Sequence, residues 1–88
     1  MTRIEQIQAA LAVLEPTFLE VIDDSARHAG HAGAATGLGH FNVVVEANAF
    51  VGLSPIARHR LVYQALGSLM QTDIHALGIQ ARVPVVSS

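Results

Sequence analysis

The sequence predicts an α+β fold in one small domain, in which a three-stranded sheet has its helices on one face. Segments with apolar residues at helical spacing alternate with short segments in which every second residue is apolar. The chain has 88 residues, 51% of them hydrophobic, which suffices for one core but not for two. We expect the order α-β-β-α-β in a single domain over residues 1–88, with its core between about residues 2 and 84.

The first helix is predicted to begin after Thr2. Thr2 and Glu5 have the spacing of a capping box, in which each side chain bonds the backbone N–H of the other residue. Apolar residues then follow at helical spacing, namely Ile4, Ile7, Leu11 and Leu14. Pro16 ends this helix, and a short strand is expected over residues 18–22.

The stretch from Asp23 to Gly39 is too rich in glycine and polar residues to form an element of its own. The clearest strand of the sequence follows it, over residues 40–46. Phe41, Val43 and Val45 alternate along this strand, so they should share its buried face.

A second long helix is predicted to begin at Ser54, as the N-cap, with Pro55 in its first position. It should run to about Gln71, with a further short helical turn near residues 51–55. Asp73 precedes the last strand, which is expected over residues 74–82 and ends before Pro84.

The second long helix is predicted to be amphipathic. Val62, Leu66 and Leu69 share one face, with His59 beside them, whereas Arg60 points away.

Composition restricts the class of protein. The formal net charge is −2, with no lysine and no cysteine, so a disulfide framework is excluded and non-specific DNA binding is not favoured. The first residues mix charged and apolar side chains, unlike a signal peptide, and no apolar run is long enough to span a membrane. We therefore expect a cytoplasmic protein without a membrane partner.

The positive charges of residues 47–88 come from Arg58, Arg60 and Arg82, and Asp73 is the only acidic residue there.

The segment RHAGHAGAATGLGHF, residues 27–41, contains three histidines and four glycines. Its glycines match neither phosphate-binding pattern, and it connects two strands instead of opening a helix. His28 and His31 could both reach one zinc ion, but a closed zinc site needs four ligands, and without cysteine this pair is a weak signal.

Other candidate residues each have a structural alternative. Arg58, His59 and Arg60 could bind nucleic acid, although an exposed arginine is usually only solvated and a histidine beside a core is usually hydrogen-bonded. His75 alternates with Leu77 and should lie at the edge of the core.

Five segments in the same order resemble the BolA proteins, from about Ile4 to Pro84. They read FLEVIDDS, RHAGHAG, HFNVVV, FVGLSPIARHRLVYQAL and DIHALGIQARVP, and the most specific parts are RHRLVY and IHAL. The resemblance implies an α-β-β-α-α-β fold related to class II KH domains. The GxxG clamp of KH domains is absent, because Pro55 stands at the second glycine position of residues 52–55.

The resemblance implies a non-enzymatic iron–sulfur accessory protein. Members of the family pair with a monothiol glutaredoxin in a heterodimer that shares a 2Fe–2S cluster, for cluster delivery or iron and redox regulation. Carried over to this chain, the metal ligands are His28, which follows DDSAR, and His75, with His31 as the alternative loop ligand. Because this chain has no cysteine, the partner must supply the sulfur ligands, from its active-site cysteine and bound glutathione.

The alternative role that the resemblance implies is a DNA-binding transcriptional regulator of morphology or stress genes. Its candidate surface consists of Arg58, His59, Arg60 and Arg82. Both roles could coexist, with cluster binding as the switch. A third option is a small interaction module whose histidines bind nothing, and the sequence does not specify self-association.

Overall fold

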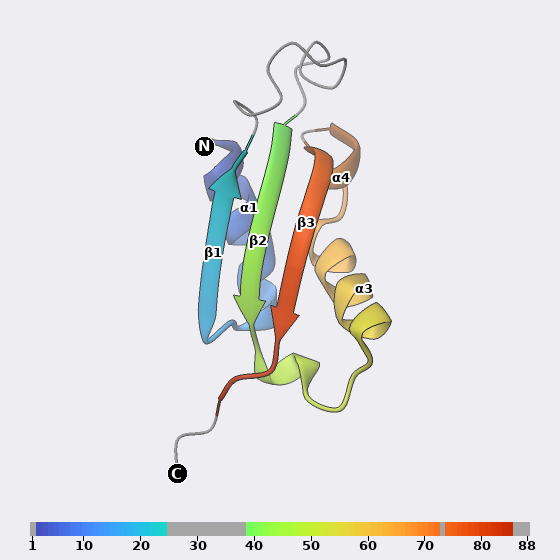
Figure 1. Cartoon of the computed structure of the whole chain (residues 1–88). Helices are drawn as coiled ribbons and strands as arrows, with labels where there is room; N and C mark the ends of the chain where they lie inside the picture. Colours follow the sequence, from blue (N-terminus) through green and yellow to red (C-terminus); the bar gives the residue numbers. More distant parts are fainter. Residues whose placement is uncertain (1, 25–38, 73, 86–88) are drawn as a thin grey trace.

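The computed structural model describes residues 2–24, 39–72 and 74–85, with side chains at all of these positions except residue 75 (Figure 1). The elements are α1 (Arg3–Leu11), the 3₁₀ turn η1 (Ala12–Leu14), β1 (Phe18–Asp23), β2 (Gly39–Glu46), the 3₁₀ turn η3 (Asn48–Phe50), α3 (Pro55–Leu66), α4 (Leu69–Thr72) and β3 (Ile74–Arg82). The α+β fold class is confirmed, in the order α-β-β-α-α-β that the family resemblance implies.

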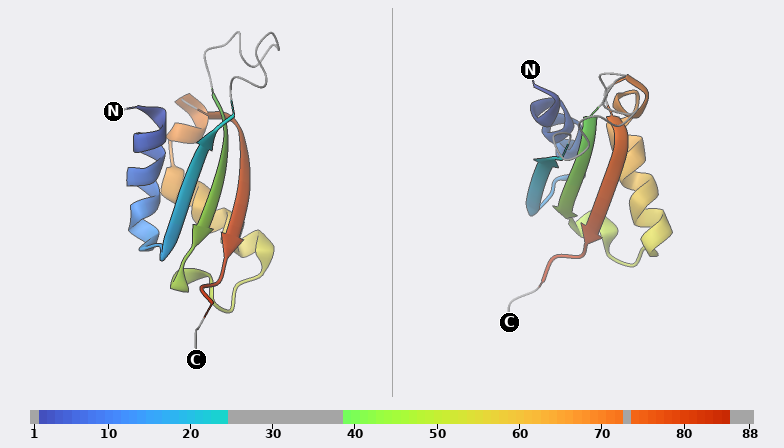
Figure 2. Two further views of the ribbon diagram at one scale, coloured as in Figure 1. Left: turned by 60° about the vertical axis from the view of Figure 1, so that its left-hand side comes forward. Right: turned by 45° about the horizontal axis from the view of Figure 1, so that its top comes forward.

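The three strands form one mixed sheet in the order β1-β2-β3. β1 and β2 are antiparallel, whereas β2 and β3 are parallel. Helices α1 and α3 lie on the same face of the sheet, as predicted, and Figure 2 shows that no described helix covers the opposite face. The sheet therefore has one face that packs against the core and one open face.

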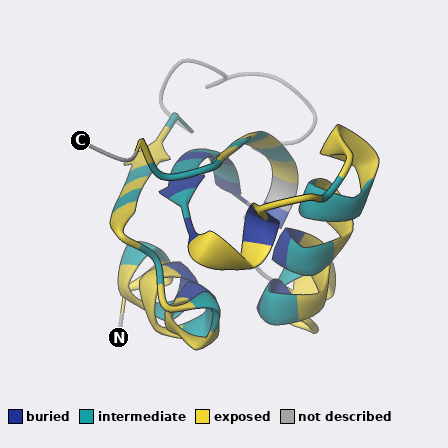
Figure 3. Cartoon of the chain, turned by 90° about the horizontal axis from the view of Figure 1, so that it is seen from below, coloured by how far each residue is buried: buried dark blue, intermediate teal, exposed yellow. Residues whose placement is uncertain are grey.

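The core lies between this sheet and the two longer helices. Phe41, Val43 and Val45 of β2 are buried, which confirms the alternation predicted from the sequence. The other buried hydrophobic residues described are Ile7, Leu11, Ala47, Phe50, Val62, Leu66 and Ile74. Figure 3 shows that the buried parts of the described elements are on their inner sides.

Both predicted helix starts are confirmed. The backbone N–H of Thr2 donates to Oε1 of Glu5 at 2.9 Å, and the N–H of Glu5 donates to Oγ1 of Thr2 at 3.1 Å. These hydrogen bonds lower the pKa of Glu5 below its ordinary value of 4.5, and the bond from the Thr2 backbone has the larger effect. At the second start, Oγ of Ser54 accepts a hydrogen bond from the N–H of Ala57 at 3.2 Å.

The second long helix is interrupted, and the prediction that it runs unbroken to Gln71 was wrong. Gly67 follows α3 with a φ of 54°, and its N–H donates to the carbonyl of Tyr63. This positive φ suits glycine, so the chain leaves the helix there and re-enters it at Leu69. The extra helical turn lies at residues 48–50, just before the predicted range 51–55.

Candidate functional site

Three chain segments meet at one end of the sheet. In the antiparallel pair Asp23 lies opposite Phe41, and in the parallel pair Gly39 lies opposite Ile74. The end of β1 and the starts of β2 and β3 therefore lie side by side (Figure 1). The segment 25–38, which includes His28 and His31, lies outside the described residues, but both of its flanking residues, Asp24 and Gly39, are at this end.

His75 is the second residue of β3 and lies at the same end of the sheet. Gly39 pairs with Ile74, but His40 pairs with Ala76, so the register shifts at this point and residue 75 is the extra residue on β3. Such a bulge interrupts the alternation of side chains along a strand. The grouping of His75 with Leu77 stays a prediction, because the side chain of residue 75 lies outside the described part.

The connection between β1 and the segment 25–38 is fixed by hydrogen bonds. The N–H of Asp24 donates to the carbonyl of His40 at 2.7 Å. Nδ2 of Asn42 donates to Oδ2 of Asp24 at 2.9 Å. Gly78 of β3 leaves room for the Asn42 side chain, because a Cβ at that position would collide with Oδ1 of Asn42. Sequence reasoning missed Asn42 and Gly78, although a glycine inside a strand often marks a close approach.

Arg82 lies at the other end of β3, and Arg58 contacts this end from α3. Arg82 lies seven positions after His75, and in an extended strand this corresponds to about 23 Å. His75 and Arg82 therefore do not belong to one site.

Arg58 holds three segments of the chain together. Its Nε donates to the carbonyl of Leu53 at 3.0 Å, and its Nη1 donates to the carbonyl of Ala81 at 3.4 Å. These bonds join the start of α3 to the preceding turn and to the end of β3. The guanidinium of Arg58 is thus engaged within the chain.

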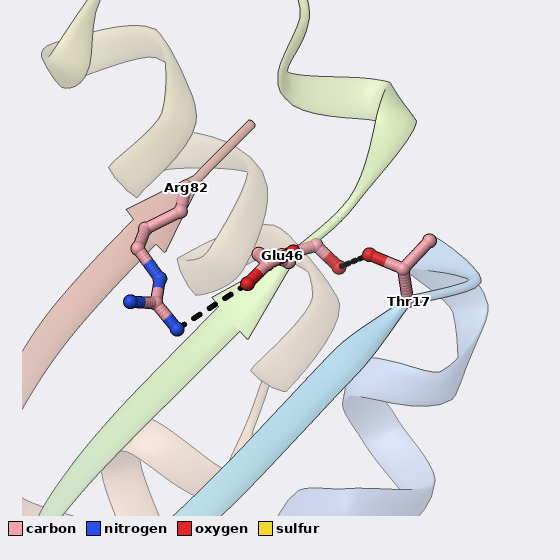
Figure 4. Close-up of polar contacts among 3 residues, drawn as sticks. All are labelled: Thr17, Glu46 and Arg82. Atoms are coloured by element: carbon pink, nitrogen blue, oxygen red, sulfur yellow. Dashed lines mark hydrogen bonds and ion pairs between the residues drawn. The ribbon is translucent and has the colours of Figure 1, made fainter. Parts of the chain in front are cut away.

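Arg82 contacts both other strands at their opposite end, and Figure 4 shows its ion pair with Glu46. Its Nη2 lies 3.3 Å from Oε2 of Glu46, and its guanidinium carbon lies 5.7 Å from the centre of the Phe18 ring. Thr17 reinforces this end of the sheet, because its N–H and its hydroxyl both donate to the carbonyl of Glu46, at 2.8 Å and 3.3 Å.

His59 and Arg60 are both exposed on α3. The outward position of Arg60 is as predicted, but His59 does not pack beside the apolar face. Partly buried Leu61 and Ala65 flank the buried Val62 and Leu66, so the apolar stripe is shifted away from residue 59. Arg82 is exposed as well, but His59 and Arg60 differ from it because their side chains form no ion pair or ring contact within the described residues.

No group of three or more histidine, cysteine, aspartate or glutamate side chains within the described residues is placed to hold a metal ion. The side chains predicted as ligands, at residues 28, 31 and 75, are not among those described. No helix in the described ranges is both long and apolar enough to cross a membrane.

Comparison with known proteins gives consistent matches. The family model described as BolA-like protein matches residues 8–85. "BolA-like protein 1" of Mus musculus is 45% identical over 71 residues, which cover 81% of this chain and 50% of that protein. "DNA-binding transcriptional regulator BolA" of Escherichia coli (strain K12) is 40% identical over 76 residues, which cover 85% of this chain and 70% of that protein. The chain spans about half the length of the first of these relatives.

A solved structure shows the same fold. The BolA domain of SufE1 from Arabidopsis thaliana superposes with a TM-score of 0.82 at 40% sequence identity. The match covers 96% of this chain and 94% of that domain. The names of these three similar proteins do not denote enzymes.

Proposed function

This chain belongs to the BolA family, and we propose that it is a non-enzymatic iron–sulfur accessory protein that binds a monothiol glutaredoxin and shares a 2Fe–2S cluster with it. One observation supports the site most directly. The backbone brings His75 to the same end of the sheet as Asp24 and Gly39, the residues that flank the segment containing His28 and His31. The proposed ligands are far apart in the sequence, but His75 and both residues that flank the segment 25–38 lie at one end of the sheet.

The donor set of the chain fits this role. It has five histidines and no cysteine, and in some 2Fe–2S centres two histidines replace two thiolates on one iron. His28 and His75 would hold one iron, with His31 as the alternative to His28, and the glutaredoxin cysteine and its glutathione would supply the sulfur ligands. When bound, the cluster supplies one-electron redox chemistry, and imidazole ligation raises its reduction potential relative to all-thiolate ligation.

The residues of this chain then have distinct tasks. His75 would ligate the iron from the start of β3, at the register shift opposite Gly39 and His40. Asn42 holds Asp24, and so fixes the point from which the segment 25–38 leaves the sheet. A ligating imidazole must be neutral, so protonation of the histidines as the pH falls should release the shared cluster.

The test is a titration of cluster-loaded monothiol glutaredoxin with this protein, followed by visible absorption and circular dichroism. We expect the spectrum to change up to a one-to-one ratio. His75→Ala should abolish the change, and so should either His28→Ala or His31→Ala. His59→Ala is the matched control, because His59 is exposed on α3, away from the starts of β2 and β3. A spectrum that stays unchanged with the wild type would contradict the proposal.

A second candidate function is DNA binding as a transcriptional regulator, and the printed name of the Escherichia coli relative favours it. Since Arg58 and Arg82 contact other groups of the chain, Arg60 and His59 are the candidates best placed to meet a phosphate. This role predicts duplex binding that weakens with salt and with Arg60→Ala, but not with His28→Ala. Salt-insensitive binding, or equal binding by the Arg60 variant, would contradict it. A cytoplasmic location remains a prediction for both roles.

A further inference from the structure

The open face of the sheet has a defined set of side chains. Leu19 and Val21 of β1 pack against the core, so the alternate residues of β1 point to the open face. The strand register extends this face across the sheet in three rows: Phe18, Glu46 and Arg82; Glu20, Val44 and Gln80; Ile22, Asn42 and Gly78. No described helix covers these rows (Figure 2).

A hollow of about 400 Å³ lies on this open face. Its lining includes Ile22, Asn42, Val44, Gly78 and Gln80, together with Asp24 at the end of β1. Because Gly78 has no side chain, the side-chain amide of Asn42 lies over β3 at this point and forms part of the lining. The floor is partly apolar, and Ile22 retains 44% of its exposure.

The charge of the open face is negative. Glu20, Asp24 and Glu46 are its acidic residues, and the guanidinium of Arg82 is paired with Glu46. Three carboxylates against one arginine give this face a net negative charge. Such a face repels a phosphate backbone and does not suit nucleic acid. A lysine or arginine fits better, because its aliphatic stem can cover apolar surface while its charged end stays at the polar rim.

We propose that the open face docks an extended basic segment of a partner protein. A lysine or arginine of that segment enters the hollow beside Gly78, its stem covers Ile22 and Val44, and its charged end meets the carboxylate of Glu20. An extended segment suits the site because every second side chain points to the same side. The spacing of these side chains matches the spacing between the rows of the open face, which are two residues apart along each strand. This proposal goes beyond cluster sharing and does not depend on it.

The test uses the full chain, labelled with ¹⁵N, and a blocked peptide of alternating valine and lysine as the probe. We expect saturable shifts of the backbone amide signals of Ile22, Val44 and Gly78. A peptide with glutamate in place of lysine, and a single-stranded oligonucleotide, should leave these signals unchanged. Because one exposed ion pair is worth little, Glu20→Lys should weaken peptide binding by roughly three- to tenfold.

Glu15→Lys is the matched control for this experiment. It changes the net charge by the same amount, and Glu15 is an exposed residue in the turn before β1, outside the rows of the open face. Peptide affinity should therefore be nearly unchanged in this variant. Equal weakening by the two variants, the absence of saturable shifts at the three amides, or binding of the oligonucleotide or the glutamate peptide to this face would overturn the proposal.

Discussion

The guanidinium of Arg82 lies 5.7 Å from the centre of the Phe18 ring, although the two residues belong to opposite edge strands of the sheet. The side chain reaches across β2, where Glu46 forms an ion pair with it at 3.3 Å. One arginine thus interacts with both other strands at the end where β1 begins. This arrangement gives Arg82 a structural role that its charge alone did not predict.

We predict that Arg82→Leu lowers the free energy of unfolding by about 0.5–1.5 kcal/mol, from the loss of a half-exposed ion pair and a cation–π contact. Urea denaturation followed by circular dichroism measures the difference. Arg60→Leu is the control, since Arg60 is exposed on α3 and should change stability by no more than about 0.5 kcal/mol. Equal losses in the two variants would show that the contacts of Arg82 with Phe18 and Glu46 contribute nothing.

Arg58→Ala should be more destabilising than Arg60→Ala. It removes two hydrogen bonds from a charged group to the carbonyls of Leu53 and Ala81, and we expect a loss of about 1.5–3 kcal/mol. Thermal and urea unfolding of both variants measure this difference. If Arg58→Ala unfolds like the wild type, Arg58 is available for a partner and the structural assignment is wrong.

Gly78→Ala should destabilise the sheet by about 1–3 kcal/mol, because the added Cβ collides with the side chain of Asn42. Asn42→Ala in the same chain removes the collision, so the double variant should lose less stability than the two single losses added together. Chemical denaturation of all four proteins gives the coupling energy. Additive losses would indicate that the strain arises elsewhere.

The capping box at the start of α1 should contribute to the acid sensitivity of the protein. Hydrogen bonds with Thr2 hold the pKa of Glu5 below its ordinary value of 4.5 in the folded chain. Their stabilising effect is therefore present above pH 4.5 and is lost as the pH falls through the lower folded pKa. In Glu5→Gln, the melting temperature should fall less steeply with pH in this acidic range. Identical slopes for wild type and variant would contradict the assignment.

The helices and strands could be predicted from the sequence, because each depends on signals from residues that are close together in the chain. The capping box at Thr2, the N-cap at Ser54 and the alternation of Phe41, Val43 and Val45 all depend on neighbouring residues. The break after α3 was missed, although Gly67 was visible, because an isolated glycine is often tolerated inside a helix.

The candidate site was harder to predict from the sequence, because its contacts connect residues of different strands and helices. The engagement of Arg58 depends on the carbonyl of Ala81, 23 residues further along the chain. The place of His75 depends on a register shift opposite the Gly39–His40 junction, which no local pattern encodes. The ligand assignment of His28 and His75 came from resemblance to a family and stays a prediction.

The central claim is that imidazoles of this chain ligate an iron that it shares with a glutaredoxin. Pulsed electron paramagnetic resonance of the reduced complex tests it directly, with ¹⁵N-labelled histidine in this chain and an unlabelled glutaredoxin. We predict strong ¹⁵N couplings from two imidazoles, both of which are lost in His75→Ala and both of which persist in His59→Ala. A reduced complex without ¹⁵N coupling from this chain would contradict the claim.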